Sequence, residues 1–186
     1  MDQVFPPHIG IVLLAVLVTA ATDLWKYKVY NVVTLPLLAC GLIYHSVVGG
    51  SAAATGSVLG AAFGFSALFV FYLLGGMGAG DVKLMSAVGA WLGMVYTFYV
   101  FIAASLAAGI YAVVAICWYR RQGETWVNLK IAWLRVRALS RHLGTEDQLE
   151  GQIAREDRRG RMIPYAAMVA IGLVATVTWS WLQRNP

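Results

Sequence analysis

One glycine-rich stretch interrupts the apolar sequence and carries an isolated charge pair: Gly75-Gly76-Met77-Gly78-Ala79-Gly80-Asp81-Val82-Lys83. Asp81 is the only acidic residue between Asp23 and Glu124, and apolar sequence flanks the stretch on both sides. An ionisable residue in or beside a membrane span is costly to bury and is a functional candidate by default. Asp81 is therefore the first candidate for chemistry in this chain.

The flanking sequence has the composition of a polytopic membrane protein. Of its 186 residues, 60% are hydrophobic and 12% charged, whereas soluble domains are about half apolar and a quarter charged. A spanning helix needs about 20 mainly apolar residues. We expect an all-α protein, a single membrane-embedded domain over residues 1–186, with a turn near Gly93-Met94-Val95 dividing one long apolar stretch. The six predicted spans are 8–24, 32–49, 55–75, 82–95, 97–119 and 163–182.

The basic residues predict the orientation of these spans. With six spans and the N-terminus outside, 13 of the 14 Lys and Arg residues fall on one side of the membrane. The positive-inside rule assigns that side to the cytoplasm. The net charge of +5 is thus a topology signal, and we expect no nucleic-acid partner. The two cysteines, Cys40 and Cys117, lie in different spans and are expected to be buried, with no metal site or cofactor.

The largest polar region is the predicted cytoplasmic insert, residues 120–162. Within it, residues 126–143 show the pattern of an amphipathic helix lying in the membrane surface. Lys130, Arg137 and Arg141 form a basic stripe on this helix, which suits contact with anionic lipid. Docking of a substrate or protein partner is the alternative.

Asp23 and Asp81 are predicted to lie at the same cytoplasmic ends of their spans and at similar depth. Two carboxyl groups held close together do not both ionise readily, so one is expected to stay protonated. Such a pair can hydrolyse a peptide without metal, one carboxylate activating water and the other acid donating a proton. For Asp23 alone, an ion pair with Lys26 is the simpler interpretation. Gly78 and Gly80 would let a substrate backbone approach Asp81 closely.

The motif around Asp81 resembles a known signature. Gly78-Ala79-Gly80-Asp81-Val82-Lys83-Leu84 is similar to the G-x-G-D-x-K-L signature of type IV prepilin peptidases, a family of intramembrane aspartyl proteases. In that family an I-P-N element follows the first Asp, and here Val29-Tyr30-Asn31 matches it at the Asn but not at the Pro. Ile163-Pro164-Tyr165 resembles the family's I-P-Y or I-P-F entry to the last span. The resemblance covers residues 8–119 and 162–182.

The resemblance implies an aspartic endopeptidase of the bacterial inner membrane that removes the short basic leader of prepilins or pseudopilins at the cytoplasmic face. It implies Asp23 and Asp81 as catalytic residues, with Gly78, Gly80, Lys83, Asn31 and Pro164 as supporting residues. Larger members also methylate the product and carry a Cys-rich domain after the first span. The short connection here, residues 23–31, contains no Cys. The chain looks most like the peptidases of tight-adherence (Flp) pili, with archaeal preflagellin peptidases as the nearest alternative.

Two functions from other classes remain open at this point. Asp23 and Asp81 could bind or relay a cation in a transporter, but this predicts further polar residues deep in the spans and internal repeats, and the sequence shows neither. A non-catalytic secretion subunit with Asp81 as a helix cap would not explain why Asp23 lies at the same depth. The sequence also leaves open a homo-oligomer.

Overall fold

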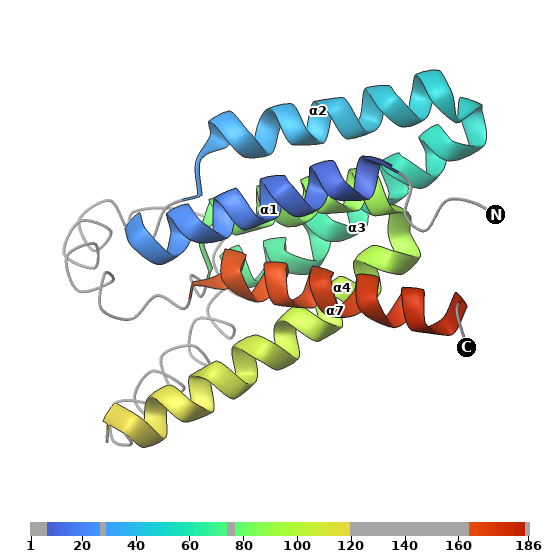
Figure 1. Cartoon of the computed structure of the whole chain (residues 1–186). Helices are drawn as coiled ribbons and strands as arrows, with labels where there is room; N and C mark the ends of the chain where they lie inside the picture. The colour runs from blue at the N-terminus through green and yellow to red at the C-terminus, as the bar shows by residue number, and fades with distance from the viewer. Residues whose placement is uncertain (1–6, 27–28, 74–76, 120–163, 185–186) are drawn as a thin grey trace, which may run out of the picture. The chain divides into compact units, whose positions relative to one another are not determined.

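The computed structural model describes residues 7–26, 29–73, 77–119 and 164–184, and these form helices with no strand. The predicted all-α class is confirmed (Figure 1). The predicted surface helix at 126–143, with Lys130, Arg137 and Arg141, lies outside the described residues. The five helices are α1 (Pro7–Lys26), α2 (Asn31–Val48), α3 (Gly50–Leu73), α4 (Ala79–Tyr119) and α7 (Tyr165–Arg184).

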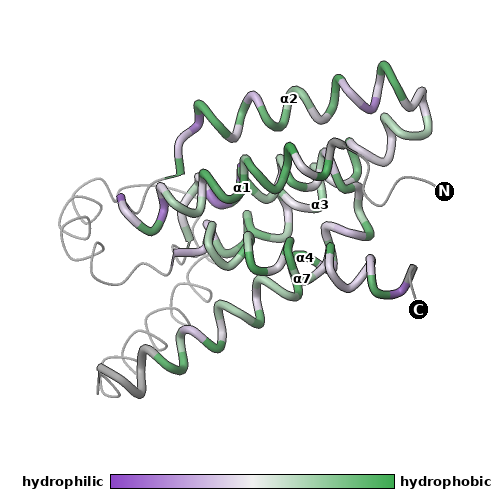
Figure 2. Tube along the Cα trace, in the orientation of Figure 1, coloured by the Kyte–Doolittle hydropathy of each residue, from purple (hydrophilic) through white to green (hydrophobic). Residues whose placement is uncertain are grey.

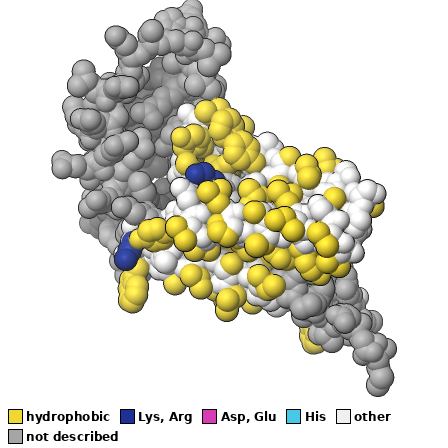
Figure 3. All heavy atoms as spheres, turned by 90° about the horizontal axis from the view of Figure 1, so that it is seen from above, with side chains coloured by type: hydrophobic (Ala, Val, Ile, Leu, Met, Phe, Trp, Pro, Cys, Tyr) yellow, Lys and Arg dark blue, Asp and Glu magenta, His cyan; other side chains and the backbone are white. Residues whose placement is uncertain are grey.

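Each of these helices is long and apolar enough to cross a membrane. Hydrophobic residues line the helices along most of their length, and hydrophilic residues gather at points such as the C-terminal end of α1 (Figure 2). The face seen in Figure 3 is dominated by hydrophobic side chains, which suits contact with lipid rather than water. The chain is a multi-pass membrane protein.

Helix α4 is broken where the sequence predicts a turn. Gly93 has φ 73° and ψ 174°, a backbone conformation that glycine adopts without steric cost and other residues avoid. The Thr97 hydroxyl donates to the Gly93 carbonyl oxygen at 2.6 Å, which satisfies a carbonyl near the break. The apolar stretch therefore forms two helical segments, on either side of Gly93.

The chain divides into two compact units, residues 1–108 with 164–186 and residues 109–163. In the first unit α1 packs against α7 and α2, and α2 packs against α3. The predicted start of the third span at residue 55 is wrong, since α3 already begins at Gly50. Gly50 has φ 68°, so a tight reversal joins α2 to α3 directly.

Small residues bring α3 and the first part of α4 into backbone contact. We call Gly60, Gly64 and Gly89 the glycine seam. A Cβ atom added at Gly60 would collide with the Gly89 carbonyl oxygen, one at Gly89 with the Gly60 carbonyl oxygen, and one at Gly64 with the Met85 carbonyl oxygen. Small residues at these positions let the two helices approach closely. Two buried hydroxyls strengthen this contact, because Ser57 donates to the Ala90 carbonyl at 2.5 Å and Ser86 to the Ala61 carbonyl at 3.0 Å.

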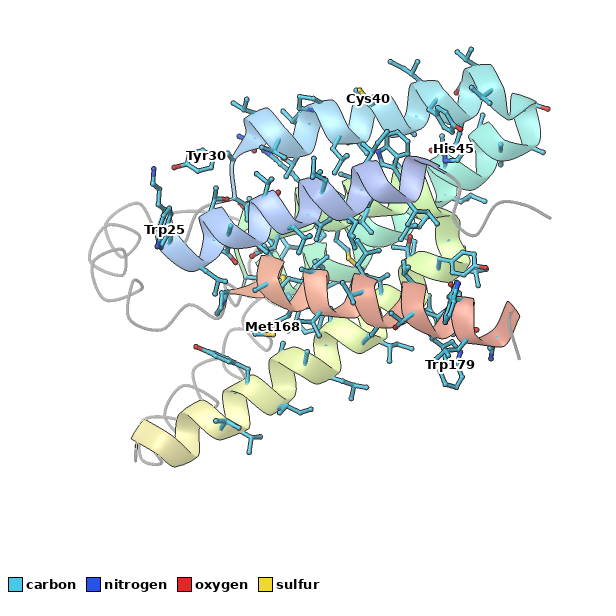
Figure 4. All side chains as sticks on the ribbon, in the orientation of Figure 1. Trp25, Tyr30, Cys40, His45, Met168 and Trp179 are labelled. Carbon is cyan, nitrogen blue, oxygen red and sulfur yellow. The ribbon has the colours of Figure 1, made fainter. Side chains whose placement is uncertain are left out.

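Helix α2 is held to α4 through Trp91. The Trp91 Nε1–H donates to the Leu37 carbonyl at 2.7 Å, and the His45 Nε2 lies 3.1 Å from the Trp91 carbonyl oxygen. Cys40 of α2 is exposed, and Figure 4 shows its side chain on the outer side of this helix. The predicted burial of Cys40 is wrong, because this side chain lies on the face of α2 that no described helix covers.

Candidate active site

Asp23 lies in the last part of α1 and is 7% exposed. Its Oδ2 accepts the backbone N–H of Ala166, at 3.1 Å, in the first turn of α7. The first N–H groups of a helix have no partner within the helix, and a carboxylate there is favoured by the helix dipole. Asp23 thus caps α7 from another helix. The Lys26 side chain is exposed and, among the described residues, makes no ion pair with Asp23.

Pro164 determines where α7 begins. Its carbonyl oxygen accepts the N–H groups of Ala167 and Met168 at 3.1 and 3.4 Å, so it stands at the N-cap position of the helix. A proline also disfavours helix in the residue before it. These effects fix the first turn of α7 at the depth where the Ala166 N–H reaches Asp23. Pro164 is therefore connected to Asp23 through the backbone of this first turn.

Asp81 lies in the first turn of α4, where a negative charge is favoured by the helix dipole. Its backbone N–H donates to the Gly78 carbonyl oxygen at 3.2 Å. Its carboxyl group lies within electrostatic range of the Asp23 carboxyl group. Asp23 and Asp81 are the two acidic residues in the part of the chain that the structure describes, and the fold brings them together from α1 and α4.

Gly78 and Gly80 each leave room for a specific neighbour. A Cβ atom at Gly78 would lie 3.3 Å from the Asp81 Oδ2, so the missing side chain gives the carboxyl group space. A Cβ atom at Gly80 would lie 2.6 Å from the Cβ of Val29. The close approach that Gly80 permits in this structure is therefore that of Val29, in the connection between α1 and α2.

Asn31 and Lys83 join the same region. The Lys83 Nζ donates to the Asn31 Oδ1 at 3.0 Å, which ties the first residue of α2 to the first turn of α4. Figure 1 shows the end of α1 and the starts of α2 and α7 at one end of this unit. Of the supporting residues named from the sequence, Gly78 lies beside the Asp81 carboxyl group, Pro164 begins the helix whose N–H binds Asp23, and Asn31, Gly80 and Lys83 contact one another's elements near the start of α4.

Tyr165 was given no functional role by the sequence patterns, although it is the last residue of the Ile163-Pro164-Tyr165 element. It is 5% exposed, and within the described residues its hydroxyl has no hydrogen-bond partner of good geometry. The Ser105 side chain is a polar neighbour, and Asp81 lies within electrostatic range. No group of three His, Cys, Asp or Glu side chains that could hold a metal occurs among the described residues.

Comparison with known proteins places the site in a family. A family model described as the type IV leader peptidase family matches residues 10–113, more than half of the chain. Three prepilin leader peptidase/N-methyltransferases are similar. That of Aeromonas salmonicida is 38% identical over 98 residues, 49% of this chain and 33% of the relative. That of Neisseria gonorrhoeae is 47% identical over 68 residues, which make up 33% of this chain and 23% of the relative.

The third, from Burkholderia pseudomallei, is 35% identical over 107 residues, 54% of this chain and 35% of the relative. The aligned region thus spans about a third or less of the length of these relatives. No solved structure is significantly similar to the chain. The family match contains Asp23, Asp81 and all the supporting residues except Pro164. The chain belongs to the type IV leader peptidase family.

Proposed function

We propose that this protein is an intramembrane aspartic endopeptidase that removes the leader peptide from type IV prepilin or pseudopilin precursors. The observation that carries the proposal is the meeting of Asp23 and Asp81, which come from different helices and lie within electrostatic range of each other. The family match and the similarity to prepilin leader peptidase/N-methyltransferases support the substrate class. Asp23 and Asp81 are the proposed catalytic residues.

The reaction needs one carboxylate and one carboxylic acid. The carboxylate removes a proton from water, and the resulting oxygen nucleophile attacks the carbonyl carbon of the scissile peptide bond. The carboxylic acid donates its proton to the substrate, the C–N bond breaks, and the new amine leaves protonated. A coupled pair titrates as a unit, so the two roles belong to the pair rather than to a named member.

The supporting residues hold this pair in place. The Ala166 N–H fixes the Asp23 carboxyl group, and Pro164 fixes the first turn that presents this N–H. Gly78 leaves room for the Asp81 carboxyl group. Lys83 and Asn31 join α4 to α2 beside it. Groups held in position before the substrate arrives lower the cost of reaching the transition state.

The membrane orientation follows from charge. With six spans and the N-terminus outside, 13 of the 14 Lys and Arg residues fall on the side to which the sequence assigns Asp23 and Asp81, which supports cleavage at the cytoplasmic face of the bacterial inner membrane. Lys130, Arg137 and Arg141 would bind anionic lipid on that face. The short connection between α1 and α2 contains no Cys. It supports a peptidase without methyltransferase activity, similar to those of tight-adherence pili; a preflagellin-like substrate is the alternative.

A cleavage assay tests the proposal. The protein is co-expressed in bacterial membranes with an epitope-tagged prepilin, and leader removal is followed by gel mobility for wild type, Asp23→Asn and Asp81→Asn. Asn keeps the size of Asp and removes its acid–base function, so we expect both variants to lose cleavage by at least about a thousandfold while accumulating normally. Asp2→Asn, which changes an acidic residue outside the described residues, is the control and should cleave normally. Cleavage near the wild-type rate by either site variant would contradict the proposal.

A further inference from the structure

The hydroxyl of Tyr165 is a buried polar group that the proposed reaction does not yet use. The residue is 5% exposed, and within the described part of the chain its hydroxyl lacks a hydrogen-bond partner of good geometry. Buried polar side-chain atoms are nearly always paired in native proteins, and an exception needs an explanation. A phenylalanine would fill the same space without leaving a polar group unpaired, so packing alone does not account for the hydroxyl.

The position of Tyr165 places this hydroxyl at the aspartate pair. The next residue, Ala166, donates its backbone N–H to Asp23. The phenol also lies within electrostatic range of Asp81 and beside the Ser105 side chain of α4. An O–H group with no good partner among the described residues therefore lies within electrostatic range of Asp81, on the residue that precedes the one bound to Asp23. A hydrogen-bond donor in this position is available to whatever binds between them.

Peptide hydrolysis creates a need for such a donor. When the water oxygen attacks the scissile carbonyl, negative charge develops on the carbonyl oxygen, and fixed donors in a site of low dielectric stabilise that charge. The aspartate pair supplies one proton but no further neutral donor. We propose that the Tyr165 hydroxyl donates a hydrogen bond to the carbonyl oxygen of the scissile peptide and stabilises the tetrahedral intermediate. The hydroxyl keeps its proton throughout, so no additional reactant is needed.

This inference rests on the proposed function, and its test separates the two. Wild type, Tyr165→Phe and the matched control Tyr99→Phe are purified in detergent, and initial cleavage rates are measured over a range of prepilin concentrations. Tyr99 is 54% exposed on α4, so its hydroxyl is remote from any buried donor role. We expect Tyr165→Phe to lower kcat about 10- to 100-fold, at or below the loss seen for a single oxyanion donor, with KM changed less than about twofold. The control should keep the wild-type kcat.

The loss should be partial, because the hydroxyl adds to a reaction that the aspartates make possible. Because the hydroxyl has no good partner among the described residues, the melting temperature of Tyr165→Phe should not fall below that of wild type.

Three outcomes overturn the inference. A wild-type kcat in Tyr165→Phe, while Asp23→Asn and Asp81→Asn remain inactive, removes Tyr165 from the reaction and leaves the aspartate pair standing. A loss of folded Tyr165→Phe protein shows that the hydroxyl is a structural partner. Activity in the Asn variants removes the aspartate pair and the Tyr165 inference together.

Discussion

The glycine seam and the aspartate end of the molecule differ in how completely their polar groups are paired. We use aspartate end for Asp23, Asp81 and the residues that contact them. At the seam, backbone meets backbone, and the two nearby hydroxyls, on Ser57 and Ser86, are each paired with a carbonyl of the facing helix. At the aspartate end, a carboxyl group is buried against a helix terminus and a buried hydroxyl lacks a good partner.

The glycine seam should contribute mainly to the stability of the fold, and the aspartate end mainly to the proposed reaction. Burying polar and charged groups is unfavourable unless they are fully paired, so the aspartate end opposes folding to a degree that the seam does not. Close van der Waals packing of small residues drives association of helices in a membrane. The seam therefore holds α3 and α4 together and leaves the aspartates free to be less than fully satisfied. Substitutions at the seam should change the amount of folded protein, whereas those at the aspartate end should first change activity.

The largest expected effect comes from Gly60→Ala in the seam. The added methyl group would collide with the Gly89 carbonyl oxygen, a backbone atom that cannot move aside without shifting α4. We expect destabilisation of about 3 kcal/mol, the upper end of the usual range for overpacking, and a large loss of folded protein. The measurement is the melting temperature and the monodisperse fraction in detergent.

Gly56→Ala is the matched control, one turn away on the same helix. No atom lies within 4 Å of an added Cβ at Gly56. This variant should be neutral or more stable by up to about 1 kcal/mol, because alanine favours helix over glycine. Equal melting temperatures for the two variants would show that the helices do not approach closely at Gly60.

A smaller loss of stability is expected from Gly80→Ala, which tests whether close packing also matters at the aspartate end. The methyl group would lie 2.6 Å from the Val29 Cβ, and relieving this contact should cost about 1–3 kcal/mol. Removing the neighbouring Cβ in Val29→Gly/Gly80→Ala should restore part of both the melting temperature and the cleavage rate. If the double variant is no better than Gly80→Ala, Gly80 is needed for something other than Val29, such as approach of the substrate backbone.

The sequence predicts the membrane architecture well because that architecture depends on local properties. Apolar stretches of sufficient length give the helices, and the break at Gly93 follows from a charge-free stretch too long for one span. The wrong details also have local causes. Helix α3 begins at Gly50, five residues before the predicted start of the span, because the chain reverses direction at Gly50. Cys40 is exposed because no described helix covers its side of α2.

The candidate site is predictable in its residues and not in its contacts. Asp23 and Asp81 stand out because isolated acidic residues are rare in such sequences, and their catalytic role stays a prediction. The hydrogen-bond and packing partners of the site residues could not be predicted from the sequence. The backbone N–H of Ala166 leaves no mark in the sequence. The contact of Gly80 with Val29 joins the start of α4 to the connection between α1 and α2, and the pairing of the Tyr165 hydroxyl depends on how α7 lies against α4. Each is a tertiary property that no local pattern encodes.

The smallest expected effect concerns the hydrogen bond between Lys83 and Asn31, which joins α4 to α2 at the aspartate end. Both residues are at least partly exposed, and interactions of charged side chains at such positions contribute at most about 1 kcal/mol. A double-mutant cycle with Lys83→Met, Asn31→Ala and the double variant isolates the coupling energy from the melting temperatures. We expect a coupling below about 1 kcal/mol and a cleavage rate within about tenfold of wild type. A coupling of zero with a strongly reduced rate would instead mean that Lys83 acts on the substrate, and the aspartate end would then extend to the start of α2 as a binding surface.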